Sequence, residues 1–548
     1  MNDEDFWKKL EEYNKNIIFS HSPKKLIVAG PGTGKTTLFK EVVKSLKIHR
    51  NQCLALTFIN NLKSELEEGL SGLANVYTFH GYCHFLLRRN KELLAGLTSD
   101  FKYFPKLIHL VKTDWKVKFD SQPPQFIRLM RELKERGPVD FYLKRSNYYD
   151  AVGYDDSVFR VYQYTKNNSG LQKSYCLVIV DEYQDFNLLE VSFLKLLSHN
   201  SPVLIAGDDD QALYCHLRNS SPQHIRDLFQ DSDFEKFELP FCTRCPEVIV
   251  NSFDDIVKKA KSIGKLHGRI DKPFRYFPPL KTQDSKKYPK IKIVHTQIQR
   301  ESSKQGANYF GRYIVEQITK IPKMEIEQSN KEGYPTILII GPKPYLPQIQ
   351  HYLEYVKWQF DIRKKGDEPV DLNIEEGLEI LKRSPDSNLG WRIVLEVERP
   401  QFFNDIIKKS LKQQKKLSEL IPRDYKEKIL KTIKEQPKEE SIDGKAEVRE
   451  KKDEKATIKL CSFEGAKGLS AQHVFVVGLQ NGDLPRNCNN VLDIEICKLL
   501  VALTRTRKQC QLLYTTNFAG KKKHPSKLLD WIDYGRKELV NVDRGYWG

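Results

Sequence analysis

Residues 29–37 combine the types that phosphate chemistry needs. This stretch, AGPGTGKTT, holds three glycines, Lys35 and three threonines. Glycines let the backbone curl until successive N–H groups point at phosphate oxygens, and a lysine can reach the terminal phosphates. The pattern is that of a P-loop, so it predicts a nucleoside triphosphate site. Its candidate contacts are Ala29, Gly30, Pro31, Gly32, Thr33, Gly34, Lys35, Thr36 and Thr37.

A pair of acids supplies the complementary half of such a site. Asp181 and Glu182 directly follow the apolar run CLVIV. One acid at a strand end can hold Mg²⁺, and a second can orient and deprotonate an attacking water. We therefore expect ATP with Mg²⁺, the metal bound by Thr36 and Asp181, and Glu182 as the general base.

Three consecutive aspartates, Asp208 to Asp210, stand in the stretch GDDDQALYCHLRN. They could form a metal cluster, a solvated turn or a relay between two ligands. An EF-hand would need acids at alternating positions and a bidentate glutamate at the twelfth, which this stretch does not offer. The residues alone leave the turn and the relay open, and we expect the aspartates to shape the loop, with Asp208 nearest to the Mg²⁺ shell.

Two sets of apolar runs must position these residues. Continuous apolar strands that alternate with helical segments predict parallel sheets covered on both faces, hence an α/β protein with two cores. The first set lies at residues 24–30, 52–58, 176–182 and 202–208. The second set lies at residues 334–341, 456–463, 473–479 and 510–516.

Two mainly helical stretches interrupt the cores and are predicted to be insertions. The second one is lysine-rich, which suits either a solvated face or a nucleic-acid contact, and its polar segment SIDGKAEVREKKDEK predicts a mobile, charged linker. The expected division is a first core at 1–84 and 171–232, its insertion at 85–170, a second core at 233–365 and 456–548, and its insertion with the linker at 366–455.

Composition narrows the class of partner. Among 548 residues, 90 Lys and Arg stand against 72 Asp and Glu, a formal net charge of +18 that favours nucleic acid, although a merely soluble surface would also be charged. There is no apolar run of membrane-spanning length, and the acidic N-terminus does not resemble a secretory signal, so we expect a cytoplasmic protein without membrane contact. Most cysteines suit a reduced compartment; Cys242 and Cys245 form one CxxC, which leaves a zinc or iron–sulfur site open.

The motifs resemble those of UvrD/Rep-type superfamily 1 DNA helicases. AGPGTGKT, VDEYQD and GDDDQALY match in order and spacing. LALTFINNLKSEL resembles the family's motif Ia, and TFHGYCHFLLR resembles its next DNA-contacting motif. Towards the C-terminus, LPFCTRC resembles motif IV, SFEGAKGLSAQHVFVVGLQNGDLP motif V and LVALTRTRKQCQLLY motif VI.

The resemblance implies two RecA-like P-loop cores with ATP between them, each with an inserted, mainly helical subdomain. Gln211 would sense the γ-phosphate while Tyr214 lies toward the DNA, which favours the relay interpretation of the three aspartates. Arg244 and Arg505 would reach the γ-phosphate from the second core, and Gly468 would join the nucleotide contacts. Asn14 takes the place of the glutamine that reads adenine. Departures are Thr243 for a stacking tyrosine, Glu464 for a histidine and Ser470 for an acid linked to the ribose.

Aromatic and polar residues near the strand ends are the candidate nucleic-acid contacts, since single-strand binders combine cations with stacking faces. The alternative is that these aromatics pack in the core, and the segment after Tyr214 is one residue longer than in the family and lacks its tryptophan. The candidates are Phe58, Asn60, Thr78, Phe79, His80, Tyr82, Tyr214 and His216.

Two functions follow from the resemblance. The first is an ATP-dependent translocase and helicase on single-stranded or tailed duplex DNA, with movement from 3′ to 5′. The alternative is a DNA-responsive ATPase switch that recruits or licenses a nuclease partner in repair or phage defence, without processive unwinding.

Overall fold

A computed structural model describes nine ranges of the chain. These are residues 2–58, 60–134, 136–168, 174–300, 308–358, 361–362, 372–413, 415–435 and 455–547. The predicted charged linker falls almost wholly outside them. Within the described ranges, no helix combines the length and the apolar character needed to cross a membrane.

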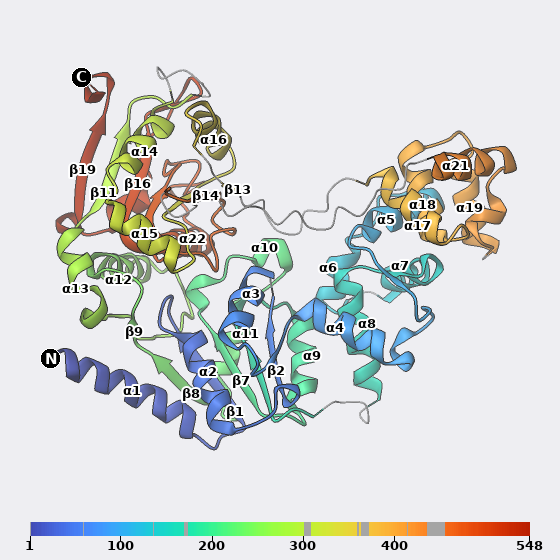
Figure 1. Ribbon diagram of the computed structural model, residues 1–548, viewed down its shortest axis with the longest axis horizontal. Coiled ribbons are helices and arrows are strands. Elements are labelled where there is room, and N and C mark those ends of the chain that lie inside the picture. The colour runs from blue at the N-terminus through green and yellow to red at the C-terminus, as the bar shows by residue number, and fades with distance from the viewer. Residues whose placement is uncertain are drawn as a thin grey trace.

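The first core is built on a six-stranded parallel sheet in the order β3-β2-β6-β7-β1-β8 (Figure 1). Alternate side chains of its central strands enter two separate hydrophobic clusters, one on each face of the sheet. Both faces are therefore covered by helices, which explains why these strands read as continuous apolar runs. The strands are β1 (Lys24–Ala29), β2 (Cys53–Thr57), β3 (Asn75–Thr78), β6 (Leu177–Val180), β7 (Val203–Gly207) and β8 (Glu235–Leu239).

Helices α1 (Asp3–Phe19), α2 (Lys35–Leu46) and α3 (Asn60–Gly69) supply side chains to one cluster of the first core. Helices α4 (Phe79–Arg89), α8 (Tyr154–Asn167), α9 (Leu188–Ser198) and α11 (Gln223–Gln230) supply side chains to the other. A turn of helix, α10 (Cys215–Arg218), follows the three aspartates.

The second core repeats this plan with a seven-stranded parallel sheet in the order β13-β14-β12-β15-β16-β11-β19. Its strands are β11 (Ile291–Thr296), β12 (Ile337–Ile340), β13 (Asp361–Ile362), β14 (Ile458–Cys461), β15 (Ala471–Val476), β16 (Thr506–Thr515) and β19 (Lys537–Val542). Its helices are α12 (Glu247–Ser262), α13 (Pro278–Lys287), α14 (Tyr309–Thr319), α15 (Lys323–Lys331), α16 (Leu346–Tyr355) and α22 (Asp493–Leu503). The prediction of two RecA-like α/β cores is confirmed.

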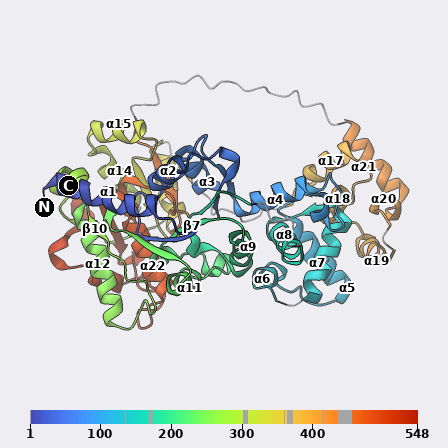
Figure 2. The same ribbon diagram turned by 90° about the horizontal axis from the view of Figure 1, so that it is seen from below.

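The two insertions pack against each other and share one hydrophobic core (Figures 1 and 2). We call this unit the insertion module. The first insertion contributes α5 (Leu107–Phe119), α6 (Phe126–Arg131) and α7 (Arg136–Tyr149). The second contributes α17 (Ile374–Arg383), α18 (Asn388–Glu398), α19 (Phe403–Gln413), α20 (Leu417–Leu420) and α21 (Arg423–Glu435). The second insertion thus lies on the first rather than on its own core.

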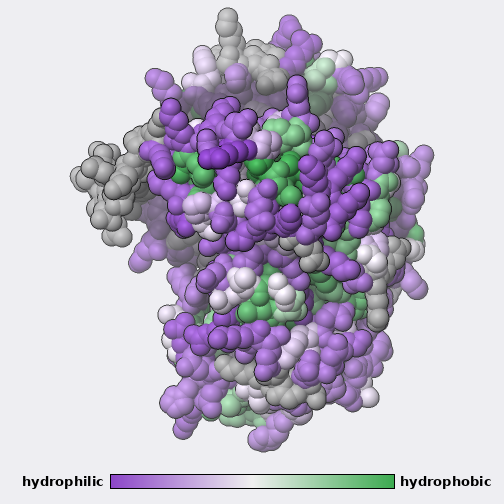
Figure 3. Space-filling model, turned by 90° about the vertical axis from the view of Figure 1, so that its right-hand side faces the viewer, coloured by the Kyte–Doolittle hydropathy of each residue, from purple (hydrophilic) through white to green (hydrophobic). Residues whose placement is uncertain are grey.

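The face of the molecule that carries the insertion module is mostly hydrophilic, with small hydrophobic areas (Figure 3). This suits a solvated face for the lysine-rich helices.

One boundary differs from its prediction: β8 pairs with β1, so the first sheet extends to Leu239, past the expected limit at residue 232. Its alternating Glu-Lys-Phe-Glu-Leu pattern belongs to an edge strand, which a search for continuous apolar runs misses.

Candidate nucleotide site between the two cores

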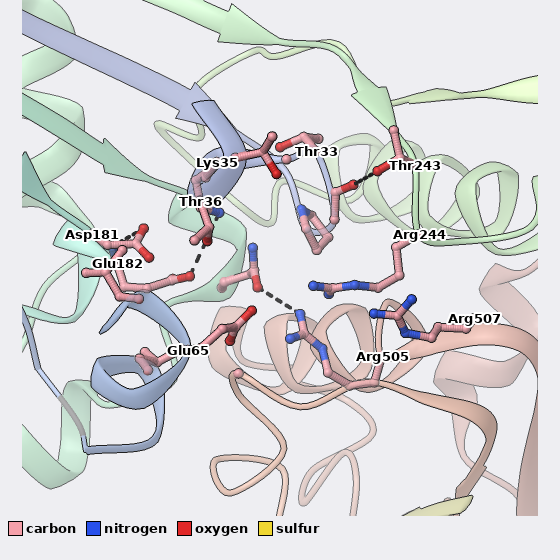
Figure 4. A pocket seen from close by; sticks show the side chains of 18 residues that line it. Thr33, Lys35, Thr36, Glu65, Asp181, Glu182, Thr243, Arg244, Arg505 and Arg507 are labelled. Atoms are coloured by element: carbon pink, nitrogen blue, oxygen red, sulfur yellow. Dashed lines mark hydrogen bonds and ion pairs between the residues drawn. The ribbon is translucent and has the colours of Figure 1, made fainter. Parts of the chain in front are cut away.

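A cavity of about 240 Å³ lies between the P-loop of the first core and the arginines of the second (Figure 4). The first core lines it with the P-loop and α2, with α3, and with the acids after β6. The predicted site residues that line it are Pro31, Gly32, Thr33, Gly34, Lys35, Thr36, Thr37, Asp181, Glu182, Gln211, Arg244, Gly468 and Arg505.

The P-loop connects β1 to the N-terminus of α2. Gly32 and Gly34 have φ angles of 71° and 87°, a left-handed conformation that favours glycine. At Gly32 a Cβ atom would also lie 2.5 Å from Cβ of Arg244, so only glycine lets the second core approach. The backbone N–H and side-chain hydroxyl of Thr243 both donate to the carbonyl of Gly32, at 2.9 and 3.0 Å. The loop is therefore shaped for phosphate and already joined to the arginine-bearing turn.

The two acids after β6 have opposite protonation tendencies. Burial, reinforced by the neighbouring Glu182, raises the pKa of Asp181 to about 7. Burial also disfavours the charge on Glu182, but the ammonium groups of Lys467 and Lys35 outweigh it and lower the pKa of that carboxyl. Lys35 Nζ lies 3.8 Å from Glu182 Oε1. A cation next to Asp181 would stabilise its charged form, which is what a metal ligand requires.

Lys467 belongs to the second core, but its side chain contacts buried groups of the first core. Its ammonium group lies 3.1 Å from Glu182 Oε2, pairs with Asp185 and donates to the carbonyl of Gln211 at 2.9 Å. The amide of Gln184 also donates to Glu182, at 2.7 Å. The position of the second core therefore bears directly on the acid that was predicted to be the base.

A direct hydrogen bond joins the two cores at the expected phosphate sensor. Arg505 Nη2 donates to Gln211 Oε1 at 2.9 Å, and the Gln211 amide donates to Asp208 at 2.8 Å. Arg505 is only 3% exposed, and burial, with the charge of Arg244 nearby, lowers its pKa to about 10. Arg244 Nη1 in turn approaches the carbonyl of Thr504 at 3.4 Å. This wall of the cavity therefore favours a bound anion.

The three aspartates form a buried ion cluster rather than part of the metal shell. Lys272 Nζ lies 2.9, 2.6 and 2.9 Å from oxygens of Asp208, Asp209 and Asp210. The three carboxylates lie close enough to one another to hold a metal ion, but the ammonium group of Lys272 already lies among them and balances their charge. Arg269 adds a bidentate pair with Asp210, both contacts at 2.7 Å. None of the three aspartates lines the cavity, but Asp208 is joined to it through the amide of Gln211, so its place nearest to the Mg²⁺ shell stays a prediction.

Three predicted nucleotide contacts lie outside the cavity lining. Ala29 ends β1 and Gly30 is buried against Phe274, where a Cβ atom would lie 2.7 Å from the ring. Both residues are buried where the chain passes from β1 into the P-loop. Asn14 lies on α1, half-buried, and does not line the cavity. The prediction that Asn14 binds adenine therefore rests on the sequence alone.

Several predicted nucleic-acid contacts are buried. Phe58, Phe79 and Tyr82 are 2%, 0% and 1% exposed and belong to one hydrophobic cluster. Their rings cannot stack on a base without moving, which corrects the expectation that loops present them to a strand. Phe79 and Tyr82 fill the core because α4 begins at Phe79, with Thr78 as its N-cap accepting from Gly81 N–H at 3.1 Å.

The remaining candidates differ in their access to solvent. His80 is buried beside Asp155, and Tyr214 donates to the carbonyl of Glu464 at 2.8 Å, so this tyrosine reaches toward motif V of the second core. Asn60 and His216 are exposed. They are the predicted contacts that a passing strand can reach in this conformation.

Sequence reasoning missed three charged residues of the cavity region. Glu65 on α3 and Arg507 on β16 line the cavity, and Lys467 contacts its acid. Lys467 and Arg507 stand inside the quoted motifs, in EGAKGLS and ALTRTR, so motif membership could have found them. Glu65 likewise stands inside a quoted motif, LALTFINNLKSEL. Cys242 and Cys245 are buried free thiols, and within the described ranges the only group of three or more clustered candidate ligands is the aspartate cluster.

A comparison with known families matches residues 14–216 to a family described as an AAA domain. A probable DNA helicase II homolog of Rickettsia conorii is 28% identical over 265 residues, which cover 39% of each chain. The homolog in Mycoplasma genitalium is 22% identical over 97% of this chain and 88% of its own length. The ATP-dependent DNA helicase UvrD1 of Mycobacterium tuberculosis is 26% identical over 46% of this chain and 39% of its own length.

The extent of these matches differs among the relatives. The chain spans about two fifths of the length of the Rickettsia and Mycobacterium relatives, but most of the Mycoplasma protein. In the order of its motifs and in its two RecA-like cores the chain is similar to DNA helicases of the UvrD/Rep type, as the names of these relatives also indicate.

Proposed function

We propose that this chain is an ATP-dependent DNA helicase that couples ATP hydrolysis to movement along single-stranded DNA. The observation that carries the proposal is the hydrogen bond between Gln211 and Arg505, which spans the two cores inside the cavity that the P-loop lines. Hydrolysis at such a boundary changes the contacts between two rigid bodies, which is how a motor converts chemistry into motion.

The P-loop would bind the triphosphate. Its backbone N–H groups and the N-terminus of α2 favour negative charge, and Lys35 would reach the β- and γ-phosphates. The hydroxyl of Thr36 and the carboxylate of Asp181 are oxygen donors that line the cavity and fit Mg²⁺. When bound, Mg²⁺ neutralises charge that develops on the transferred phosphoryl group.

Glu182 would act as the general base. In the described conformation its carboxylate is held by Lys467 and Lys35, which keeps it ionised but makes it a weak base. A shift of the second core that withdraws Lys467 would raise the pKa of Glu182 and free the carboxylate to accept a proton from water. Base strength would thus depend on the arrangement of the cores.

Arg244 and Arg505 would stabilise the charge on the γ-phosphate in the transition state. Arg244 lies on the turn joined to Gly32 and Arg505 lies beside Gln211, so both would act only when the two cores close around ATP. Alternating closure and opening would move the strand, with 3′ to 5′ polarity proposed by family resemblance.

The alternative of an ATPase switch that licenses a nuclease is not favoured. The relatives described above are named as DNA helicases, and neither a nuclease partner nor a role in antiviral defence finds support in them. By the family resemblance, we propose DNA repair as the setting of this activity.

The test is ATP hydrolysis with single-stranded DNA, single-stranded RNA and duplex DNA, measured side by side at a stated salt concentration. We expect stimulation by single-stranded DNA above the other two. Strand displacement on 3′-tailed and 5′-tailed duplexes then measures polarity. ATP hydrolysis that no nucleic acid stimulates, together with no displacement of either duplex, would contradict the proposal.

A further inference from the structure

A third arginine, Arg507, faces the nucleotide cavity and has no role in the mechanism above. It stands on β16, two residues after Arg505, and lines the cavity together with Arg244 and Arg505. Figure 4 shows its side chain extending toward that of Arg244. Three guanidinium groups therefore converge on one wall, where the phosphoryl chemistry has used only two.

The second core holds Arg507 from behind. Its Nε donates to the hydroxyl of Ser470 at 3.0 Å, and its guanidinium carbon lies 3.9 Å from the ring centre of Tyr334. Stacking on an aromatic face fixes the plane of a guanidinium and leaves its edge free to bind an anion. The side chain is thus positioned before any ligand arrives.

The charge of Arg507 is poorly balanced. Among the described residues its carboxylate neighbour within 4 Å is Glu332, at 3.9 Å and nearly half exposed, where screening weakens the pair. Burial, with the charge of Arg244, lowers the pKa of Arg507. Neighbouring guanidinium groups in a partly buried cavity repel one another unless an anion lies between them. This arrangement suits a polyanionic ligand.

The position of Arg507 differs from that of Arg505. Arg505 is nearly fully buried and bonded to Gln211, whereas the side chain of Arg507 is 28% exposed. Arg505 therefore lies at the enclosed end, beside the phosphate sensor, and Arg507 lies closer to the mouth. A nucleotide whose γ-phosphate reaches the enclosed end would have its α- and β-phosphates nearer to the mouth.

We propose that Arg507 binds the α- and β-phosphates of the nucleotide and sets its affinity rather than the rate of phosphoryl transfer. The proposal rests on the proposed ATP-binding function. ATP and ADP share these two phosphates, so Arg507 recognises a nucleoside diphosphate unit. Arg505 and Arg244 would instead distinguish ATP from ADP through the γ-phosphate.

The test compares Arg507→Ala and Arg507→Lys with the wild-type protein. Fluorescent ATP and ADP analogues give the two dissociation constants, and steady-state hydrolysis gives kcat and KM. Loss of a charge-assisted bidentate contact predicts that Arg507→Ala weakens binding of both nucleotides about 10-fold or more, with kcat changed less than about 3-fold. Arg507→Lys should fall between, because it keeps the charge but loses the planar stack.

Two controls and three outcomes make the test decisive. Arg50→Ala, an exposed arginine outside the cavity, should change neither constant, and partial rescue by Arg507→Lys shows that the fold is intact. Weakened binding of ATP alone would make Arg507 a γ-phosphate contact and overturn the proposal, as would unchanged binding of both nucleotides. Wild-type protein that binds neither nucleotide would instead refute the proposed function itself.

Discussion

The nucleotide cavity and the insertion module both bury charged side chains, but they balance them in opposite ways. In the module, Asp114 is fully buried and its carboxylate accepts from Arg145 at 2.7 Å and pairs with Arg392 at 3.0 Å. Burial alone would lower the pKa of Arg145, but Tyr149 and Asp114 raise it. In the cavity, the pKa of Arg505 is lowered instead.

This difference separates a structural network from a binding site. In the module, cation and anion come from helices of both insertions, and the Asp114 carboxylate is surrounded by donors. In the cavity, Lys35 and Lys467 pair with Glu182, but among the described residues no carboxylate lies within 4 Å of the guanidinium groups of Arg244 and Arg505. A site that must accept a charged ligand leaves charge to be balanced by that ligand, whereas an interior that must hold two segments together balances its own.

Removing the P-loop lysine should have the largest effect on the cavity. Because Lys35 is the cation nearest to the expected β- and γ-phosphates, Lys35→Ala should lower ATP hydrolysis by about 10⁴-fold. Hydrolysis measured by phosphate release checks this. Turnover close to that of the wild-type protein would remove the P-loop from the site.

Replacing the base should slow hydrolysis without removing the nucleotide. Glu182→Gln keeps the shape of the side chain but cannot accept a proton, so the rate should fall by about 10³-fold. Binding of an ATP analogue should change little, since the P-loop is intact. An unaltered hydrolysis rate would assign the base to another residue.

Breaking the network of the module should cost stability rather than chemistry. Asp114→Ala leaves Arg145 and Arg392 buried without their shared anion, which should destabilise the module by about 3–5 kcal/mol. Hydrogen exchange over α5, α7 and α18 measures this locally, which suits a protein with several folded units.

The matched control for that variant is Asp140→Ala, an exposed carboxylate on α7. It should leave exchange unchanged. If Asp114→Ala exchanged no faster than this control, the buried network would not hold the two insertions together.

The smallest expected effect lies on the nucleic-acid side. His216 is exposed on α10. The variant His216→Ala loses one ring that could stack on a base, so it should bind single-stranded DNA more weakly by about 1 kcal/mol, or roughly 5-fold. Fluorescence anisotropy at fixed salt measures this, with exposed His21→Ala as the control. Equal affinities of the two variants would leave the strand contact to other residues.

The sequence predicted what local motifs encode. The P-loop, the acids after β6 and the two cores rest on short spacing rules and continuous apolar strands, and the structure brings most of these residues to one cavity. Lys272 escaped prediction because it reaches the aspartates from about 60 residues away, with no motif to announce it. The shared core of the insertions likewise depends on contacts between distant segments.

Burial of the aromatic candidates shows a second limit. Phe79 and Tyr82 stand in a motif that resembles a DNA contact, yet helical spacing on α4 turns both rings into the core. Residue type and motif membership cannot decide which face of a helix is exposed. The exposed Asn60 and His216 share the same kind of local signal.

The most direct test of the account is single-turnover ATP hydrolysis by Arg505→Ala in the presence of single-stranded DNA. We predict that this variant binds ATP but hydrolyses it about 10³-fold more slowly than the wild-type protein, because the second core no longer reaches the γ-phosphate. Hydrolysis at the wild-type rate would show that the first core works alone, and would contradict a site completed between the two cores.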